Sequence, residues 1–136
     1  ARGLCDWIGS GSVTAVHASE FSVNHSSGFA GTADALIDTP LGLTLLDFKT
    51  TSREADKPEP WLVDYQDQLG AYSLALQEMS GIKVAAGAIV IAKPDGNVQL
   101  RMLSELEMRG CECRWQERND RYQAMVSIGA ISEWSG

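Results

Sequence analysis

The sequence predicts an α/β domain in which helices flank a central mixed β-sheet. Two observations carry this prediction: the order of elements is three extended segments, a helix, two extended segments and a helix, and one extended segment is apolar enough to be a buried strand. With 136 residues, the chain can bury a core without disulfides or metals. We therefore expect residues 1–136 to form a single domain.

The first three extended segments cover residues 13–23, 28–38 and 43–50. Residues 13–23 alternate loosely between apolar and polar side chains, as strands do. A four-residue link, Thr39-Pro40-Leu41-Gly42, joins the second segment to the third. Pro and Gly favour tight turns, so this pair is predicted to be a β-hairpin. Residues 51–60 are polar and contain prolines, which indicates an exposed, mobile loop.

A helix is predicted to follow this loop. Its apolar side chains recur at steps of three and four, which places them on one buried face, and Gly81 is positioned to end the helix. The residues of this stripe are Leu62, Tyr65, Leu69, Tyr72, Leu76 and Met79.

The last elements are a strand pair and a second helix. Residues 84–92 are short and apolar, residues 94–97 (Pro-Asp-Gly-Asn) indicate a turn, and residues 98–103 are the returning strand. Ser104 and Glu107 have the spacing of a capping box, which opens a helix through about Met125.

Composition narrows the class of protein. A net charge of −7 argues against a general polyanion binder, although acids around a metal can coexist with a local basic track. Cys5, Cys111 and Cys113 are odd in number and lack CxxC spacing, so we expect free thiols in a reducing compartment. No apolar run could cross a bilayer and no signal-peptide pattern is seen. These features predict an intracellular protein without a membrane partner.

Charged residues interrupt the predicted hairpin where apolar residues would be expected. If Asp38 pairs with Leu43, then Asp34 faces Asp47 directly and Thr32 faces Lys49. Opposed residues have Cβ atoms roughly 4.5–5.5 Å apart, and two carboxylates so close repel each other unless a cation lies between them. Mg²⁺ or Mn²⁺ would suit these oxygens, with Lys49 beside them. The alternative is a solvent-facing hairpin whose charges are merely hydrated.

Three motifs resemble the signature of the PD-(D/E)XK nuclease superfamily, and more narrowly its RecB-like exonuclease branch. They are Gly31-Thr-Ala-Asp34, Asp47-Phe-Lys49 and Gln68-Leu-Gly-Ala-Tyr72, in the order and on the elements that the family uses. Residues 45–52 and 67–72 are also similar to mitochondrial genome maintenance exonucleases and related phage enzymes. The resemblance implies a restriction-endonuclease-like core and, because the chain begins with Ala1, a missing N-terminal helical part.

The resemblance also implies a mechanism. Asp34, Asp47 and the backbone carbonyl of Phe48 would bind Mg²⁺ or Mn²⁺, and Lys49 would orient or deprotonate the attacking water. The expected reaction is hydrolysis of DNA, at free ends or in single strands, to leave a 5′-phosphate. Glu20 lies where the family often has an acidic metal ligand; a solvated strand glutamate is an equal alternative.

Gln68 and Tyr72 are one helical turn apart and share a face. In the family this pair borders the active site, although Tyr72 also fits the buried stripe. The family's RecB-like members carry a histidine on an upstream helix, and neither His17 nor His25 matches it. That mismatch puts the activity of this chain in question, though not the resemblance.

Other residues are candidates for binding substrate. Arg53 and Lys57, in the loop after the Asp47 strand, are the best candidates for phosphate contacts. Trp61 and Trp115 could stack on unpaired bases, although packing is the commoner role of tryptophan. No iron–sulfur cluster is expected, because a cluster needs four thiolates. The final helix carries a basic stripe offset by acids, which usually indicates a solvated face; its residues are Arg114, Arg118 and Arg121.

Three further interpretations remain open. The same fold could serve as a catalytically weak DNA-binding module within a larger assembly. The motifs could also coincide by chance in a domain that is not a nuclease, in which case added metal would not stabilise the protein. An endonuclease of the same superfamily is a third possibility, which the Gln68–Tyr72 motif disfavours by family analogy.

Overall fold

The computed structural model describes residues 13–127, which form a five-stranded sheet with two α-helices. The predicted element order and the mixed sheet flanked by helices are therefore confirmed. Strands are β1 (Ala15–Asn24), β2 (Ala30–Thr39), β3 (Gly42–Thr50), β4 (Ala86–Ala92) and β5 (Val98–Leu103); helices are η2 (Glu59–Leu62, a 3₁₀ turn), α2 (Val63–Ser80) and α3 (Glu105–Ser127).

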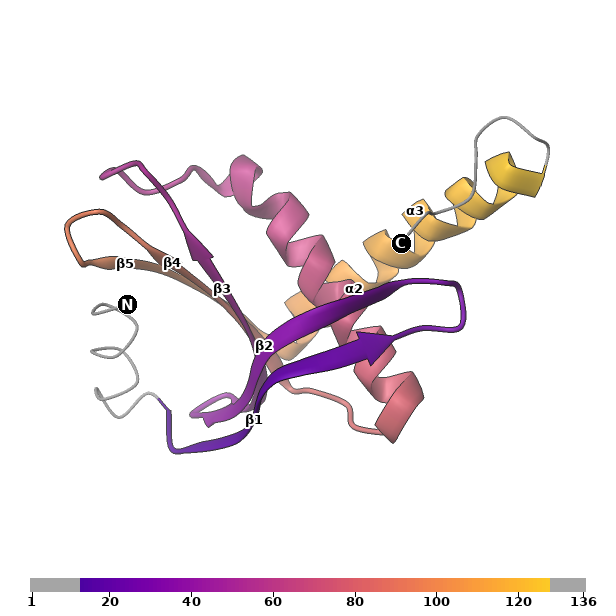
Figure 1. Ribbon diagram of the computed structural model, residues 1–136, viewed down its shortest axis with the longest axis horizontal. Helices are drawn as coiled ribbons and strands as arrows, with labels where there is room; N and C mark the ends of the chain where they lie inside the picture. The colour runs from indigo at the N-terminus through magenta and orange to yellow at the C-terminus, as the bar shows by residue number, and fades with distance from the viewer. Residues whose placement is uncertain (1–12, 128–136) are drawn as a thin grey trace.

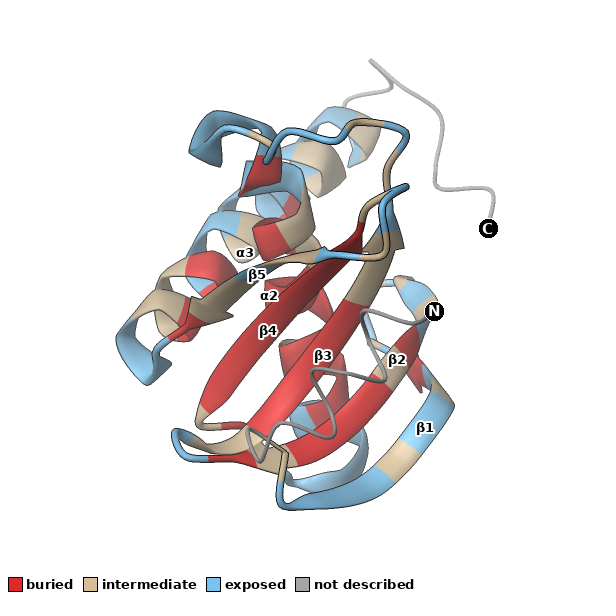
Figure 2. Ribbon diagram, turned by 90° about the vertical axis from the view of Figure 1, so that its left-hand side faces the viewer, coloured by how far each residue is buried: buried red, intermediate tan, exposed pale blue. Residues whose placement is uncertain are grey.

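The strands lie side by side in chain order, β1-β2-β3-β4-β5. Neighbours are antiparallel except for β3 and β4, which are parallel and are connected through α2. Figure 1 shows α2 and α3 on the same side of the sheet, and Figure 2 shows the opposite face of the sheet in front of both helices. A parallel pair needs such a crossover, since a tight hairpin can only reverse the chain.

The β2–β3 hairpin has the predicted register but a tighter turn. Asp38 pairs with Leu43 as expected, and Thr39 also pairs with Gly42, so the loop contains two residues rather than four. Gly42 has φ 108°, a conformation that glycine adopts without steric cost. The turn therefore brings β2 and β3 together directly, up to the pair Ala35–Leu46.

Helix α2 follows the predicted stripe, although Tyr65 is only half-buried and Met79 is exposed. Leu62, Leu69, Tyr72 and Leu76 are buried, whereas Met79 is 48% exposed because it lies in the last turn, beyond the core. The helix ends as predicted: Gly81 has φ 74° and its N–H donates to the carbonyl of Gln77.

The second half of the fold agrees closely with the prediction. Strand β4 begins two residues later than expected, and Lys93 N donates to the carbonyl of Asn97 to close the turn into β5. The capping box opens α3: Glu107 N donates to Ser104 Oγ (3.2 Å) and Ser104 N donates to Glu107 Oε1 (3.1 Å).

Both faces of the sheet bury apolar side chains. The larger cluster lies between the sheet and the helices, and includes Leu45, Leu69 and Met108. The smaller cluster lies on the opposite face and includes Leu46 and Val90. Figure 2 shows the resulting band of buried residues along β2, β3 and β4. This arrangement fixes β3 on both sides, and its odd-numbered residues face the helices.

Within the described part of the chain, neither long helix combines the length and the apolar character that crossing a bilayer requires. Cys111 is buried and Cys113 is exposed, both as free thiols. Cys5 and the region around residues 5–11, where the family histidine was considered, lie outside the described residues.

Candidate nuclease active site

The site forms where the β2–β3 ladder stops. The last ladder pair is Ala35–Leu46, and beyond it the backbone of β3 continues only along β4. Asp34 Oδ2 instead accepts a hydrogen bond of 2.6 Å from the N–H of Phe48. The ladder therefore does not extend to the predicted pairs Asp34–Asp47 and Thr32–Lys49, because the Asp34 side chain takes the place of a strand–strand hydrogen bond. This hydrogen bond keeps the Asp34 carboxylate next to β3 at Phe48, the residue after Asp47.

Asp47 is the most strongly perturbed acid of the described chain. It is 4% exposed, and its Oδ2 is buried without any hydrogen-bond partner among the described residues. Burial raises its pKa from 3.8 to about 6; Lys49 acts against this rise, and the charge of Asp34 adds to it. A buried carboxylate oxygen without a partner is costly, so this atom is suited to receive a cation.

Lys49 is held beside Asp47 by three contacts. Its Nζ donates to Gln68 Oε1 (2.9 Å), lies 3.5 Å from Asp47 Oδ1 and sits 5.2 Å from the centroid of the Tyr65 ring. Asp47 and Lys49 share the helix-facing side of β3 because side chains alternate along a strand. The structure thus brings together Asp34, Asp47, Lys49 and Gln68, as the sequence predicted.

Tyr72 explains why a glycine begins the first motif. A Cβ at Gly31 would lie 2.7 Å from Tyr72 Cε1 and 3.0 Å from its hydroxyl oxygen. Only glycine lets this buried ring approach β2 so closely. Burial raises the pKa of Tyr72, and so do the charges of Asp47 and then Asp34. The Tyr72 ring therefore lies close enough to the two acids to sense their charge.

The residues present fit a hard divalent cation. Asp34 and Asp47 supply carboxylate oxygens, the backbone carbonyl of Phe48 follows Asp47 directly on β3, and the buried Asp47 Oδ2 has no hydrogen-bond partner among the described residues. No group of three or more His, Cys, Asp or Glu side chains gathers in residues 13–127. The candidate site is therefore two carboxylates supplemented by a backbone oxygen.

Glu20 does not join Asp34 and Asp47 in a group of three acids that could hold a metal ion within residues 13–127. Its neighbours Ser19 and Phe21 pair with Ala35 and Ala33, so Glu20 lies level with Asp34 on β1. Glu20 itself is exposed and has φ 46°, a backbone conformation unusual for a non-glycine residue. Its assignment as a metal ligand stays a prediction.

The predicted phosphate-binding residues lie on the same loop but contact aromatic rings. Arg53 stacks over the Trp61 ring at 4.4 Å, and its Nη1 is buried without a partner in the described structure. Lys57 Nζ donates to the Tyr65 hydroxyl (3.0 Å), and the Lys57 backbone is tied to β5 through Gln99. This loop is therefore anchored at Lys57 rather than free.

One other expectation changed. Trp61 is 56% exposed, so it is not a packing residue as the commoner role of tryptophan suggested. On α3, Arg114 and Arg118 of the basic stripe are exposed, as expected for a solvated face offset by acids, and both bind Asp67 of α2 (2.9 and 3.1 Å). A buried acid attracts these side chains because an isolated buried charge is costly.

Tyr65 is a candidate site residue that sequence reasoning placed only in the buried stripe. Its ring lies 5.2 Å from both Lys49 Nζ and Lys57 Nζ, and it is half-buried. Its position three residues before Gln68, on the same helical face, was the available signal.

A family model described as the PD-(D/E)XK nuclease superfamily matches residues 7–125 of the chain. The chain belongs to the PD-(D/E)XK nuclease superfamily. The five-stranded mixed sheet with its flanking helices is consistent with that family's restriction-endonuclease-like fold. The comparison with curated proteins found no match.

Solved structures also resemble the chain. A putative exonuclease from Eubacterium rectale superposes with a TM-score of 0.55 at 12% identity, covering 96% of this chain and 52% of that protein. An alkaline exonuclease from Laribacter hongkongensis gives a TM-score of 0.38 at 11% identity, covering 93% of this chain and 70% of that protein. The chain spans about half the length of the first of these proteins, and at such identities the likeness concerns the fold alone.

Proposed function

We propose that this chain is a metal-dependent deoxyribonuclease, acting as an exonuclease on DNA ends or single strands and leaving a 5′-phosphate. The observation that supports this most directly is the buried, unpartnered Oδ2 of Asp47 next to Asp34 and Lys49. In a member of a nuclease superfamily, such a cluster has an evident use, since it is unfavourable for the metal-free protein.

Each group of the site has a proposed role in the reaction. Asp34, Asp47 and the Phe48 carbonyl would hold Mg²⁺ or Mn²⁺, and Asp34 is oriented for this by the Phe48 N–H. A divalent ion in such a site polarises the phosphodiester and lowers the pKa of a bound water. Lys49, kept in place by Gln68, can orient the nucleophile or stabilise the negative charge that develops on the phosphate.

Substrate binding would use the groups around this centre. Arg53 and Lys57 offer positive charge on the loop after β3, and the buried Arg53 Nη1 still lacks an acceptor in the described structure. A phosphate oxygen is the kind of acceptor that guanidinium binds best. Gln68 and Tyr72 complete the proposed substrate side of the site.

The test is digestion of end-labelled single- and double-stranded DNA in Mg²⁺, Mn²⁺ or EDTA. We expect metal-dependent cleavage that falls by at least 100-fold in Asp47→Ala and Lys49→Ala, as for removal of other electrostatic stabilisers. Lys83→Ala is the matched control, since Lys83 is exposed and its side chain makes no hydrogen bond or ion pair with the described residues; it should cleave like the parent. The ladder of products gives the polarity of digestion, and internal fragments before end products would instead indicate an endonuclease.

The alternative is a DNA-binding module with weak catalysis. It predicts that the parent binds DNA and that metal raises its melting temperature, an effect that Asp47→Ala abolishes. It also predicts that cleavage is negligible in the parent and in every variant. If metal neither supports cleavage nor raises the melting temperature of the parent, both proposals fail.

A further inference from the structure

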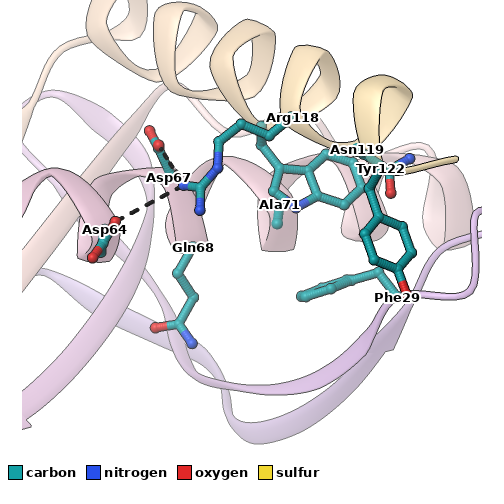
Figure 3. A pocket seen from close by; sticks show the side chains of 9 residues that line it. Phe29, Asp64, Asp67, Gln68, Ala71, Arg118, Asn119 and Tyr122 are labelled. Carbon is teal, nitrogen blue, oxygen red and sulfur yellow. Dashed lines mark hydrogen bonds and ion pairs between the residues drawn. The ribbon is translucent and has the colours of Figure 1, made fainter. Parts of the chain in front are cut away.

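An open pocket of about 430 Å³ lies beside the candidate active site, between α2, α3 and the turn before β2. Gln68 belongs to both places: its Oε1 binds Lys49, and its side chain also lines the pocket. Figure 3 shows Gln68 and Arg118 toward one end of this pocket and Phe29 and Tyr122 toward the other. A group in the pocket is therefore separated from Lys49 by one side chain.

The walls of the pocket are partly aromatic. Phe29, Trp115 and Tyr122 line it, with the Phe29 and Trp115 rings 5.6 Å apart at 68°. Phe29 also lies 5.6 Å from Tyr72, the ring near the two acids. Aromatic side chains thus lead from the candidate active site into the pocket, and aromatic rings are the surfaces on which unpaired bases stack.

The charges of the pocket disfavour a phosphate. Asp64 and Asp67 line it together with a single cation, Arg118, whose Nη1 is already 3.1 Å from Asp67 Oδ2 and 3.9 Å from Asp64 Oδ1. Two carboxylates against one guanidinium leave no net positive charge for an anion. An uncharged, flat ligand with hydrogen-bonding edges is the better match.

Asn119 supplies such an edge contact. It lines the pocket, is only 7% exposed, and its side chain makes no hydrogen bond with any other residue between 13 and 127. The polar end of this side chain is therefore available to a ligand in the pocket. Its carbonyl oxygen and its NH₂ group can both pair with the edge of a nucleobase.

We propose that this pocket binds the unpaired nucleobase of a nucleotide adjacent to the scissile phosphodiester, between the aromatic walls and the amide of Asn119. The proposal rests on the proposed nuclease function, which places the phosphodiester at Asp47 and Lys49. It assigns single-stranded DNA as the substrate class at this position, because a base in a duplex would first have to leave its stack. Trp61, which is 56% exposed, is the competing stacking residue.

The experiment measures binding rather than cleavage. Asp47→Asn serves as the background, so that the oligonucleotide stays intact. A 12-nucleotide single strand with a fluorophore at one end is compared with strands in which one nucleotide is abasic, stepped inward from the free end. We expect one position at which losing the base weakens binding on the order of 10-fold, within the range known for base–aromatic stacking.

Variants then assign that position to the pocket. Asn119→Ala and Asn119→Asp, in the same background, should remove most of the base-dependent difference, whereas Glu117→Gln, an exposed change on the same helix, should retain it. Having two Asn119 variants, each checked by its melting temperature, guards against a folding defect in one of them. If the difference in affinity between normal and abasic strands persists in both folded Asn119 variants but disappears in Trp61→Ala, the pocket proposal is overturned and the base stacks on Trp61.

The outcomes separate this proposal from the proposed function. Equal affinity for normal and abasic strands at every position, or no binding of either, overturns the base pocket even if the parent protein cleaves DNA. A base-dependent affinity that Asn119 controls supports the pocket even if the parent does not cleave DNA with any metal, a result that would refute only the nuclease.

Discussion

Replacing Asp47 by Asn should stabilise the metal-free protein while removing its response to metal. The carboxylate of Asp47 is buried next to Asp34, and only Lys49 opposes the resulting rise of its pKa. An amide of the same shape has no charge to desolvate and no repulsion with Asp34. The free energy of unfolding of Asp47→Asn should therefore exceed that of the parent at neutral and alkaline pH.

The magnitude follows from the pKa. The folded-state pKa of Asp47 is about 6, against an ordinary value of 3.8, so the folded protein binds this proton more tightly than the unfolded chain does. At about 1.4 kcal/mol for each pKa unit, the difference is roughly 3 kcal/mol. The parent loses this stability as pH rises from about 4 to about 6, and the advantage of the variant should be complete above pH 6 and absent below pH 4.

The assay is urea unfolding in EDTA, from pH 4 to pH 8, on the parent, Asp47→Asn and the exposed control Glu117→Gln. Glu117→Gln removes the same charge without burial and should track the parent within about 0.5 kcal/mol. A variant that is less stable than the parent at pH 8, or a difference that does not change with pH, would refute the buried-carboxylate argument. Added Mg²⁺ should stabilise only the parent and the control.

Three packing predictions follow from close approaches in the fold. Gly70→Ala places a Cβ 2.6 Å from the Cys111 carbonyl. Ala is favoured over Gly in a helix by about 1 kcal/mol, but the backbone of α3 has to move, so the free energy of unfolding should fall by about 1–2 kcal/mol. An unchanged free energy of unfolding would mean that the two helices can separate freely. Gly31→Ala should displace the Tyr72 ring, lowering the free energy of unfolding by about 1–3 kcal/mol and weakening the metal-induced rise in melting temperature. If stability falls but the metal effect is unchanged, the position of the Tyr72 ring does not affect the metal site. Ser73→Ala leaves the buried Glu112 without its 2.6 Å donor and should cost about 1–3 kcal/mol in urea unfolding, whereas exposed Ser52→Ala should be neutral.

Local patterns in the sequence determined much of this fold. The turn residues, the helical stripe, the capping box of Ser104 and Glu107, and the left-handed Gly81 act over a few residues, so each can be recognised without knowing the rest of the chain. The hairpin register followed from its turn, which also placed Asp34 near Asp47. The motif residues of the candidate site were within reach of the same reasoning, because they lie on neighbouring strands and one helical face.

Only the tertiary structure decided how these residues are used. The Asp34 side chain accepts a hydrogen bond from the Phe48 N–H, Gly31 makes room for Tyr72, and the buried Asp67 binds the exposed Arg114 and Arg118. The pocket beside Gln68 combines residues from 29 to 122. Such contacts depend on the distance and burial of groups far apart in the chain, and a carboxylate's desolvation or an amide's lack of partners exists only once the surrounding elements have packed.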